Sequence, residues 1–303
     1  MTDPTWALVQ YTTAGGADAR VGVSAADGIH AAPQGWPASI AALLDEWRAL
    51  EDELRALDPS ALPLVDGATL IAPITYPRKV ICAGANYYDH AAEMGTAVPD
   101  PHATPFFFLK PPTTTIVGSG AEIEMPRSTS ADVDWEAELG VVIADRVKEI
   151  SAEEALDHVA GYLNANDISA RGLFPRTDPV AAPFAFDWIG HKGLDGFCPI
   201  GPGLVPQWLI EDVNDLDITL TVNDVVKQQS NTKNLVASVA ALISAASQLV
   251  TLEPGDIILT GTPAGVGMPR KEFLSAGDVL TVEIAGLGRL VNTMVPAATK
   301  AQE

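Results

Sequence analysis

Hydrophobic and polar residues alternate, or form short apolar runs, along most of this chain, which predicts a structure rich in β-strands. Residues 216–226 alternate as a strand pair does, with Asn223 and Asp224 at the turn. Residues 135–143 begin with alternation and continue as an apolar run, which is the pattern of a buried strand. Further strands are predicted at residues 6–11, 21–23, 80–84, 106–109 (a short buried strand), 257–259, 279–284 and 290–295.

Helical signals are fewer than strand signals. Residues 39–57 form an amphipathic pattern with Ser39 as its N-cap, and a proline follows its end. Residues 151–154 match a capping box and predict a helix that runs towards His158. Further helices are predicted at residues 86–94, before Gly95, and at residues 235–249. These signals predict an α+β, strand-rich fold with its helices at the periphery.

The chain divides into two parts of unequal size. Residues 1–72 are predicted to form a small N-terminal domain, and residues 73–303 to form the main body, with prolines marking the passage between them. Residues 169–206 hold many prolines, glycines and aromatics and show little periodicity. This segment is therefore predicted to be a long loop over a site.

Composition narrows the class of protein. Apolar residues make up 47% of the 303 residues and charged residues 19%, as expected of a folded globular protein. The net charge of −21 argues against partners such as nucleic acid or anionic membrane surfaces. Cys82 and Cys198 are expected to be free buried thiols in a reducing compartment. Since we find no signal peptide and no apolar run of about 18 residues, we expect a cytoplasmic, soluble protein.

Three carboxylates form a candidate metal site. Glu136 and Glu138 are two apart in a predicted strand, so their side chains would point to the same face, and Asp167 follows further along the chain. Carboxylates that converge at the end of a buried strand repel one another unless a cation compensates, which favours a hard divalent ion. A strand with one solvated face shows the same alternation, and Asp132 and Asp134 share this parity. The pattern alone leaves both interpretations open.

Other residues suggest acid–base and anion chemistry. His90 and Glu93 would share a helix face, where the carboxylate orients the imidazole as a general base; a chance pair on a surface helix is the alternative. Lys110 and Lys192 could bind a carboxylate or stabilise an enolate, or they could be solvated surface lysines. The glycine-rich residues 260–267 lack the endings of a phosphate loop and of a dinucleotide motif, so no nucleotide site is expected.

Several motifs occur together in an order that matches a known family. They are residues 86–90 with Glu93 and Met94, residues 107–111, residues 135–139 with Asp167, and residues 255–263 with 265–267. On these motifs, over roughly residues 79–295, the chain resembles the fumarylacetoacetate hydrolase family. The resemblance is to its acylpyruvases and its 2-hydroxyhepta-2,4-diene-1,7-dioate isomerases.

The resemblance implies a fold and a cofactor. The fold is a mixed β-sheet roll with peripheral helices in a catalytic domain at residues 73–303, usually as a homodimer. The implied ion is Mg²⁺ or Mn²⁺, with Ca²⁺ as a further candidate, held by Glu136, Glu138 and Asp167. The implied substrates are small 2-oxo acids, chiefly acylpyruvates and other β-diketo acids.

The resemblance also implies a reaction, which is hydrolysis of a C–C bond through a metal-bound enolate. His90, oriented by Glu93, would deprotonate water, and Lys192 would hold the developing oxyanion. Four further residues would contact the substrate: Asn86, Lys110, Arg171 and Thr262.

The chain departs from the family pattern at three places. Similar proteins often carry Arg where Ala85 stands and Gln where Phe174 stands, and the family's Gly-Lys-Ser is His191-Lys192-Gly193 here. By the resemblance, these positions would surround the part of the pocket that contacts the distal end of the substrate, so the changes favour a bulkier or more apolar substrate than a small acylpyruvate. Two other functions stay open. One is an isomerase, decarboxylase or dehydratase on the same scaffold, and the other is a non-catalytic, metal-stabilised small-molecule binding protein.

Overall fold

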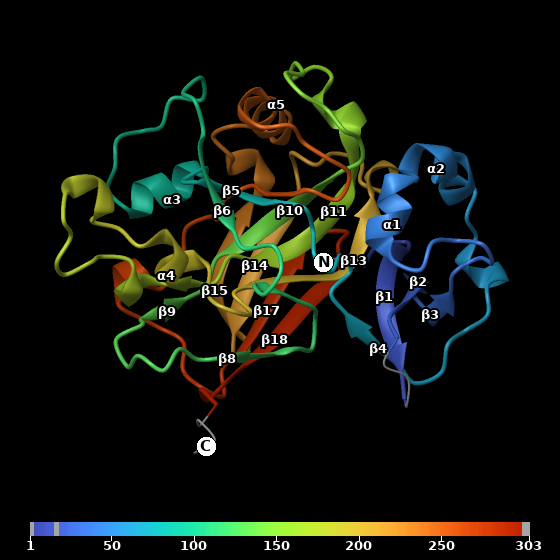
Figure 1. Cartoon of the computed structure of the whole chain (residues 1–303), viewed down its shortest axis with the longest axis horizontal. Helices are drawn as coiled ribbons and strands as arrows, with labels where there is room; N and C mark the ends of the chain where they lie inside the picture. Colours follow the sequence, from blue (N-terminus) through green and yellow to red (C-terminus); the bar gives the residue numbers. More distant parts are fainter. Residues whose placement is uncertain (1–2, 15–17, 299–303) are drawn as a thin grey trace.

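The computed structural model describes residues 3–14 and 18–298 and is built mainly of strands (Figure 1). The strands of its largest sheet are β1 (Ala7–Thr13), β2 (Arg20–Ala25), β3 (Gly28–Ala31), β4 (Ala68–Ile71), β5 (Val80–Gly84), β6 (Phe106–Lys110), β7 (Ile116–Val117), β10 (Ala137–Ile143), β11 (Val159–Asn166), β13 (Cys198–Pro206) and β16 (Ile257–Leu259). Their order is β3-β2-β1-β13-β11-β10-β16-β5-β6, with β4 paired to β1 and β7 paired to β13.

A second sheet packs against the first. Its strands, in the order β15-β14-β17-β18-β8, are β15 (Val225–Asn231), β14 (Asp217–Val222), β17 (Val279–Ile284), β18 (Arg289–Val295) and β8 (Glu122–Glu124). Val141 and Tyr162 of the large sheet share one buried cluster with Leu220 and Val282 of this sheet. Most pairs are antiparallel, but β5–β16, β7–β13 and β8–β18 are parallel. The predicted strand-rich, mixed-sheet fold is therefore confirmed.

The N-terminal strands continue the large sheet. β1 pairs with β13 through Leu8 and Leu204, and both side chains are fully buried in a cluster that also holds Trp47. Figure 1 shows this blue segment on one side of the molecule, with α3 and α4 on the other. The helices are α1 (Ile40–Asp45), α2 (Trp47–Arg55), α3 (Tyr88–Glu93), α4 (Trp188–Lys192) and α5 (Val239–Leu249). The boundary at residue 72 stays a prediction.

Three helix predictions need correction. Residues 39–57 form two helices with a break at Glu46, although Ser39 caps the first by accepting a hydrogen bond from the Ala42 amide at 3.1 Å. Residues 151–154 make the reciprocal capping contacts, but a 3₁₀-helix at Ala155–His158 follows them instead of an α-helix. The helix predicted at 235–249 begins only at Val239, because Ser238 caps it. Local signals identified the Ser39 cap and the 151–154 capping box, whereas the Ser238 cap was not recognised in the sequence.

Two strand predictions also need correction. Residues 106–109 were predicted to be buried, yet Phe106 is 53% exposed and Leu109 is 59% exposed, because β6 is the edge strand of the sheet. Residues 198–206 were assigned to a loop, yet they form β13 in the middle of the sheet. The prolines and glycines of β13 hide its strand character in the sequence. By contrast, the turn at Asn223 and Asp224 is confirmed, with φ of 51° and 62°.

The remaining structural elements are short. β9 (Val133–Asp134) pairs with β12 (Ser169–Ala170). The 3₁₀-helices lie at Pro59–Ala61, Ala155–His158, Arg171–Leu173, Ala182–Phe184, Gln207–Leu209, Thr232–Asn234 and Met268–Arg270.

Cys82 and Cys198 are free and buried, as predicted, and burial raises the pKa of the Cys198 thiol to about 12. None of the helices in the described ranges is long and apolar enough to cross a bilayer.

Close approach of β11 and β13 requires glycine at position 161. A Cβ atom there would lie 2.2 Å from the carbonyl oxygen of Val205. Gly161→Ala is therefore expected to lower the free energy of unfolding by about 1–3 kcal/mol, measured by urea denaturation. Gly84→Ala is the control, since its Cβ would meet Phe108 at an ordinary 3.7 Å. Equal stability of the two variants would contradict this packing.

Candidate metal centre and active site

The three predicted metal-site carboxylates lie together in the structure. Glu136 follows β9, Glu138 lies on β10, and Asp167 follows β11, whose residue Asn166 pairs with Ala137. A carboxylate oxygen from each of the three lies within 4.8 Å of the other two, and all three residues are buried. The solvated-face interpretation therefore does not describe Glu136 and Glu138. We call these three residues the carboxylate triad.

The triad differs from its prediction in one detail. Glu136 was expected in the same strand as Glu138, but β10 begins only at Ala137. The Glu136 backbone instead hydrogen-bonds to the side chain of Asn166, the last residue of β11, and to the backbone of Asp167 after it. The Glu136 amide donates to Asn166 Oδ1 at 3.0 Å, and its carbonyl accepts from the Asp167 amide at 2.8 Å. These two bonds bring Asp167 next to Glu136.

Three cationic side chains surround the triad. Lys110 Nζ donates to Asp167 Oδ1, and Lys192 Nζ donates to Glu136 Oε2 and Asp167 Oδ2 at 2.7 Å each. Arg171 Nη2 donates to Glu136 Oε1 at 2.5 Å. Both lysines are buried, so the surface-lysine interpretation is wrong for them. Their predicted roles towards substrate stay predictions, because in this structure they contact the triad.

The charges of the triad are unevenly balanced. Burial opposes ionisation of Glu136, but Lys192 and Arg171 outweigh it and hold its pKa well below the usual range. Burial raises the pKa of Glu138 well above its usual value, and the charges of Asp167 and Glu136 raise it further. A hard divalent cation bound by these oxygens would relieve that repulsion, so the donor set fits Mg²⁺, Mn²⁺ or Ca²⁺.

Helix α3 places the predicted acid–base pair near the triad. His90 Nδ1 lies 3.2 Å from Glu93 Oε2, and Glu93 Oε1 accepts a hydrogen bond from the Gly265 amide at 3.0 Å. His90 is buried, and its charged form helps lower the pKa of Glu136. The pair is therefore neither exposed nor isolated, and the glycine-rich loop holds Glu93 in place.

Asn86 and Thr262, the other predicted substrate contacts, make internal hydrogen bonds. Asn86 Nδ2 donates to the carbonyls of Ala237 and Thr260, and Asn86 Oδ1 accepts from the Ala237 amide. Thr262 Oγ1 accepts from Gln228 Nε2 at 2.8 Å. Asn86 thus joins the start of α3 to the loop after β16, and its role towards substrate stays a prediction.

Two buried residues at the site were missed as functional candidates. Gln228 Oε1 accepts from the Ala137 amide at 2.9 Å, so this side chain connects β10 to the glycine-rich loop. No motif in the sequence marks it. Asp134 is fully buried and accepts from Arg171 Nε at 3.0 Å and from the Gly267 amide at 2.7 Å. Its place in the acidic run was the available signal.

Two of the three sequence departures lie in the loop that brings Lys192 to the triad. Phe174 packs on His191, with ring centroids 4.4 Å apart. Burial lowers the pKa of His191 to about 4, helped by the Lys192 charge, so this imidazole is neutral near pH 7. Ala85 is exposed, and Gly193 is the C-cap residue of α4. Phe174, His191 and Gly193 therefore lie in the loop that carries Lys192, whereas Ala85 directly follows β5.

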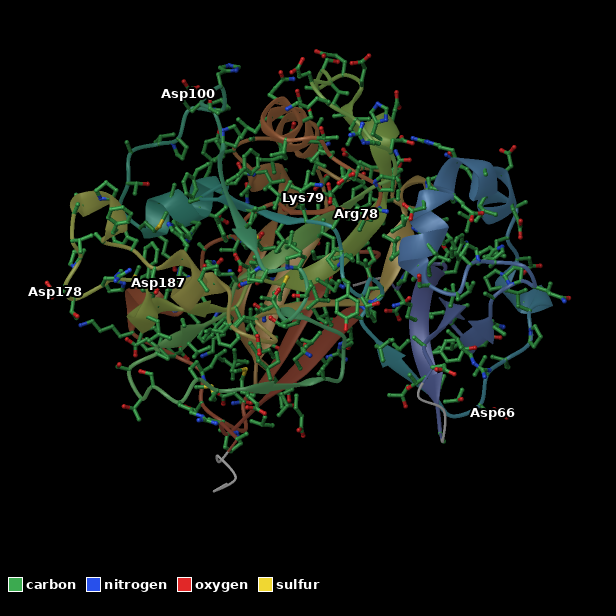
Figure 2. All side chains as sticks on the ribbon, viewed as in Figure 1. Asp66, Arg78, Lys79, Asp100, Asp178 and Asp187 are labelled. Atoms are coloured by element: carbon green, nitrogen blue, oxygen red, sulfur yellow. The ribbon has the colours of Figure 1, made fainter. Side chains whose placement is uncertain are left out.

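Helix α4 begins at a side-chain cap. Asp187 Oδ1 accepts from the Gly190 amide at 2.8 Å, which fixes the turn that carries Lys192 to the triad. Figure 2 shows Asp187 and Asp178 of this loop on the side of the molecule away from Asp66. The loop therefore lies on the same side as α3.

Comparisons with known proteins agree with this geometry. Residues 79–295 match the family model described as fumarylacetoacetate (FAA) hydrolase, C-terminal. A Xenopus laevis protein named mitochondrial oxaloacetate tautomerase fahd2 is 40% identical over 297 residues, covering 95% of this chain and 90% of that protein.

Two solved structures are also similar. The fumarylacetoacetate hydrolase of Exiguobacterium antarcticum has a TM-score of 0.79 and 34% identity, covering 97% of this chain and 100% of that one. The maleylpyruvate hydrolase of Sphingobium sp. SYK-6, solved with manganese(II) and pyruvate, has a TM-score of 0.73 and 29% identity, covering 96% and 100%.

Proposed function

Because this chain belongs to the fumarylacetoacetate hydrolase family, whose members are enzymes that act on keto acids, we propose that it is a divalent-metal-dependent enzyme acting on a short 2-oxo acid through its enolate. The observation that carries the proposal is the buried carboxylate triad with the His90–Glu93 pair near it. A bound Mg²⁺ or Mn²⁺ would supply the Lewis acid that stabilises an enolate.

Keto–enol tautomerisation is the reaction we place first. With Nδ1 of His90 donating to Glu93, Nε2 of His90 is free to take a proton from the carbon next to the 2-oxo group. The same imidazolium then returns a proton to the enolate oxygen, so atoms and charge balance without a further reactant. The similarity to a protein named oxaloacetate tautomerase supports this choice.

Hydrolysis of a C–C bond in an acylpyruvate-like acid is the second candidate. The same imidazole could deprotonate a water molecule that attacks the distal carbonyl, while the Lys192 ammonium stabilises the developing oxyanion. Burial would lower the pKa of Lys192, but Asp167 and Glu136 outweigh burial and keep it raised, so Lys192 stays protonated. The similarity to a maleylpyruvate hydrolase supports this candidate.

The identity of the metal, the homodimer and the cytoplasmic location are also proposals. The family membership favours an enzyme over a non-catalytic binding protein. The net charge of −21 supports the expectation that neither nucleic acid nor an anionic membrane is a partner.

A substrate panel tests the proposed function. Oxaloacetate, acetylpyruvate and other 2-oxo acids are incubated with the protein and Mg²⁺ or Mn²⁺, and products are followed by NMR. Tautomerisation conserves mass and hydrolysis yields two acids. We expect EDTA to abolish turnover and added Mn²⁺ to restore it. Turnover that is unchanged in EDTA, or no turnover of any 2-oxo acid, would contradict the proposal.

A further inference from the structure

One face of β6 leads from the triad to the surface. Phe106, Phe108 and Lys110 alternate along this strand, so their side chains share a face. Lys110 is fully buried and contacts Asp167, the ring of Phe108 lies 5.2 Å from Lys192 Nζ, and Phe106 is 53% exposed. Exposure therefore increases step by step along this face, away from the triad.

Aromatic rings from the long loop cover this face. Trp188 stacks on Phe108 with centroids 4.9 Å apart and lies 5.5 Å from Phe106. Phe174 meets Trp188 edge-on at 4.9 Å. We call Phe106, Phe108, Phe174 and Trp188 the aromatic wall. Its four rings come from two segments that are far apart in the sequence, and it begins where Lys192 meets the triad.

The charges beside the wall do not suit a second carboxylate on the substrate. Lys110, Lys192 and Arg171 already donate to carboxylates of the triad. Aromatic faces carry negative electrostatic potential, which disfavours an anion against them. Within residues 171–192, the only other arginine or lysine is Arg176, which is exposed.

We propose that the aromatic wall binds an aryl group at the end of the substrate distal to its carboxylate, so that the substrate is an aryl-substituted 2-oxo acid. This inference rests on the proposed function, because the carboxylate end is placed at the triad. Phe108 lies about 7 Å along β6 from Lys110, which is comparable to the span of an arylpyruvate. A cavity of about 180 Å³, lined by Ala85, Pro105 and Phe106 among others, lies at the outer end of the wall.

The test compares matched pairs of acids on the manganese-loaded protein. Phenylpyruvate is compared with oxaloacetate for tautomerisation, and benzoylpyruvate with acetylpyruvate for C–C cleavage. Binding is measured by titration calorimetry and turnover as kcat/KM. We expect the aryl acid of each pair to be preferred about tenfold, and Trp188→Leu and Phe108→Leu each to reduce that preference by up to about tenfold. The thermal stabilisation of each variant by Mn²⁺ shows that it folds.

Each other outcome has a defined meaning. Arg176→Ala should leave all four acids unaffected; a loss confined to oxaloacetate would indicate a distal carboxylate and overturn the inference. Equal losses for aryl and non-aryl acids in the two leucine variants would also overturn it. A leucine variant that changes its oligomeric state but keeps the wild-type aryl preference would overturn it as well. Preferential binding of aryl acids without turnover would keep this inference and overturn the proposed function. Turnover without a preference for aryl acids would keep the proposed function and overturn this inference.

Discussion

Glu138→Gln is expected to abolish tight binding of Mn²⁺ and to lower turnover by roughly 10³-fold, equivalent to about 4 kcal/mol of transition-state stabilisation. The substitution keeps the shape of the side chain, and an amide oxygen can still accept the hydrogen bond from the Gly261 amide. It removes one of the three anionic oxygen donors that a hard cation needs. Metal affinity is measured by calorimetry and turnover with the best acid of the panel.

The stability of the metal-free protein gives an independent readout for Glu138→Gln. The variant removes one of three buried carboxylates that repel one another, so its melting temperature without metal should equal or exceed that of the wild type. Added Mn²⁺ should stabilise the wild type and not the variant. Asp132→Asn is the matched control, since Asp132 belongs to the same acidic run but is exposed. Wild-type affinity for Mn²⁺ in Glu138→Gln would refute the metal site.

His90→Ala is expected to lower kcat by about 10²–10⁴-fold while the affinity for Mn²⁺ persists. In the proposed mechanism the imidazole moves a proton at the site, and Glu93 holds its orientation through the bond at Nδ1. It supplies none of the carboxylate oxygens of the triad, so metal binding should not depend on it. Turnover and calorimetric titration with Mn²⁺ on the same preparation separate the two effects.

The control for His90→Ala is His102→Ala. His102 lies in the connection between α3 and β6 and is exposed, so its removal should leave both kcat and metal affinity unchanged. A loss of Mn²⁺ affinity in His90→Ala would mean that the imidazole acts through the metal rather than on the substrate. Unchanged turnover in His90→Ala would rule out both of the proposed mechanisms.

Part of the fold could be predicted because its signals are local. The turn at Asn223 and Asp224 needs left-handed backbone, which these residue types tolerate, and its neighbours alternate in hydropathy. The cap at Ser39 depends on the residues within one turn, and it was predicted for that reason. The exposure of β6 could not be predicted, because its apolar residues look like those of a buried strand and only the sheet order places it at an edge.

Part of the site could be predicted for the same reason. His90 and Glu93 are three residues apart, so helix geometry alone puts them on one face. Glu136 and Glu138 are close in sequence, although β10 begins between them. Asp167 was predicted to join them from the family resemblance, since no local pattern connects it to β10.

The sequence by itself determined the strand-rich class, the motifs in their order and the residue types of the candidate site. The tertiary structure alone decided how these residues contact one another. Lys110 reaches Asp167 across 57 positions of sequence, and Gln228 reaches Ala137 across 91. Periodicity and capping report on neighbours within a few residues, whereas these contacts depend on sheet order and register. The aromatic wall has the same origin, because Phe108 and Trp188 meet only when the long loop folds over β6.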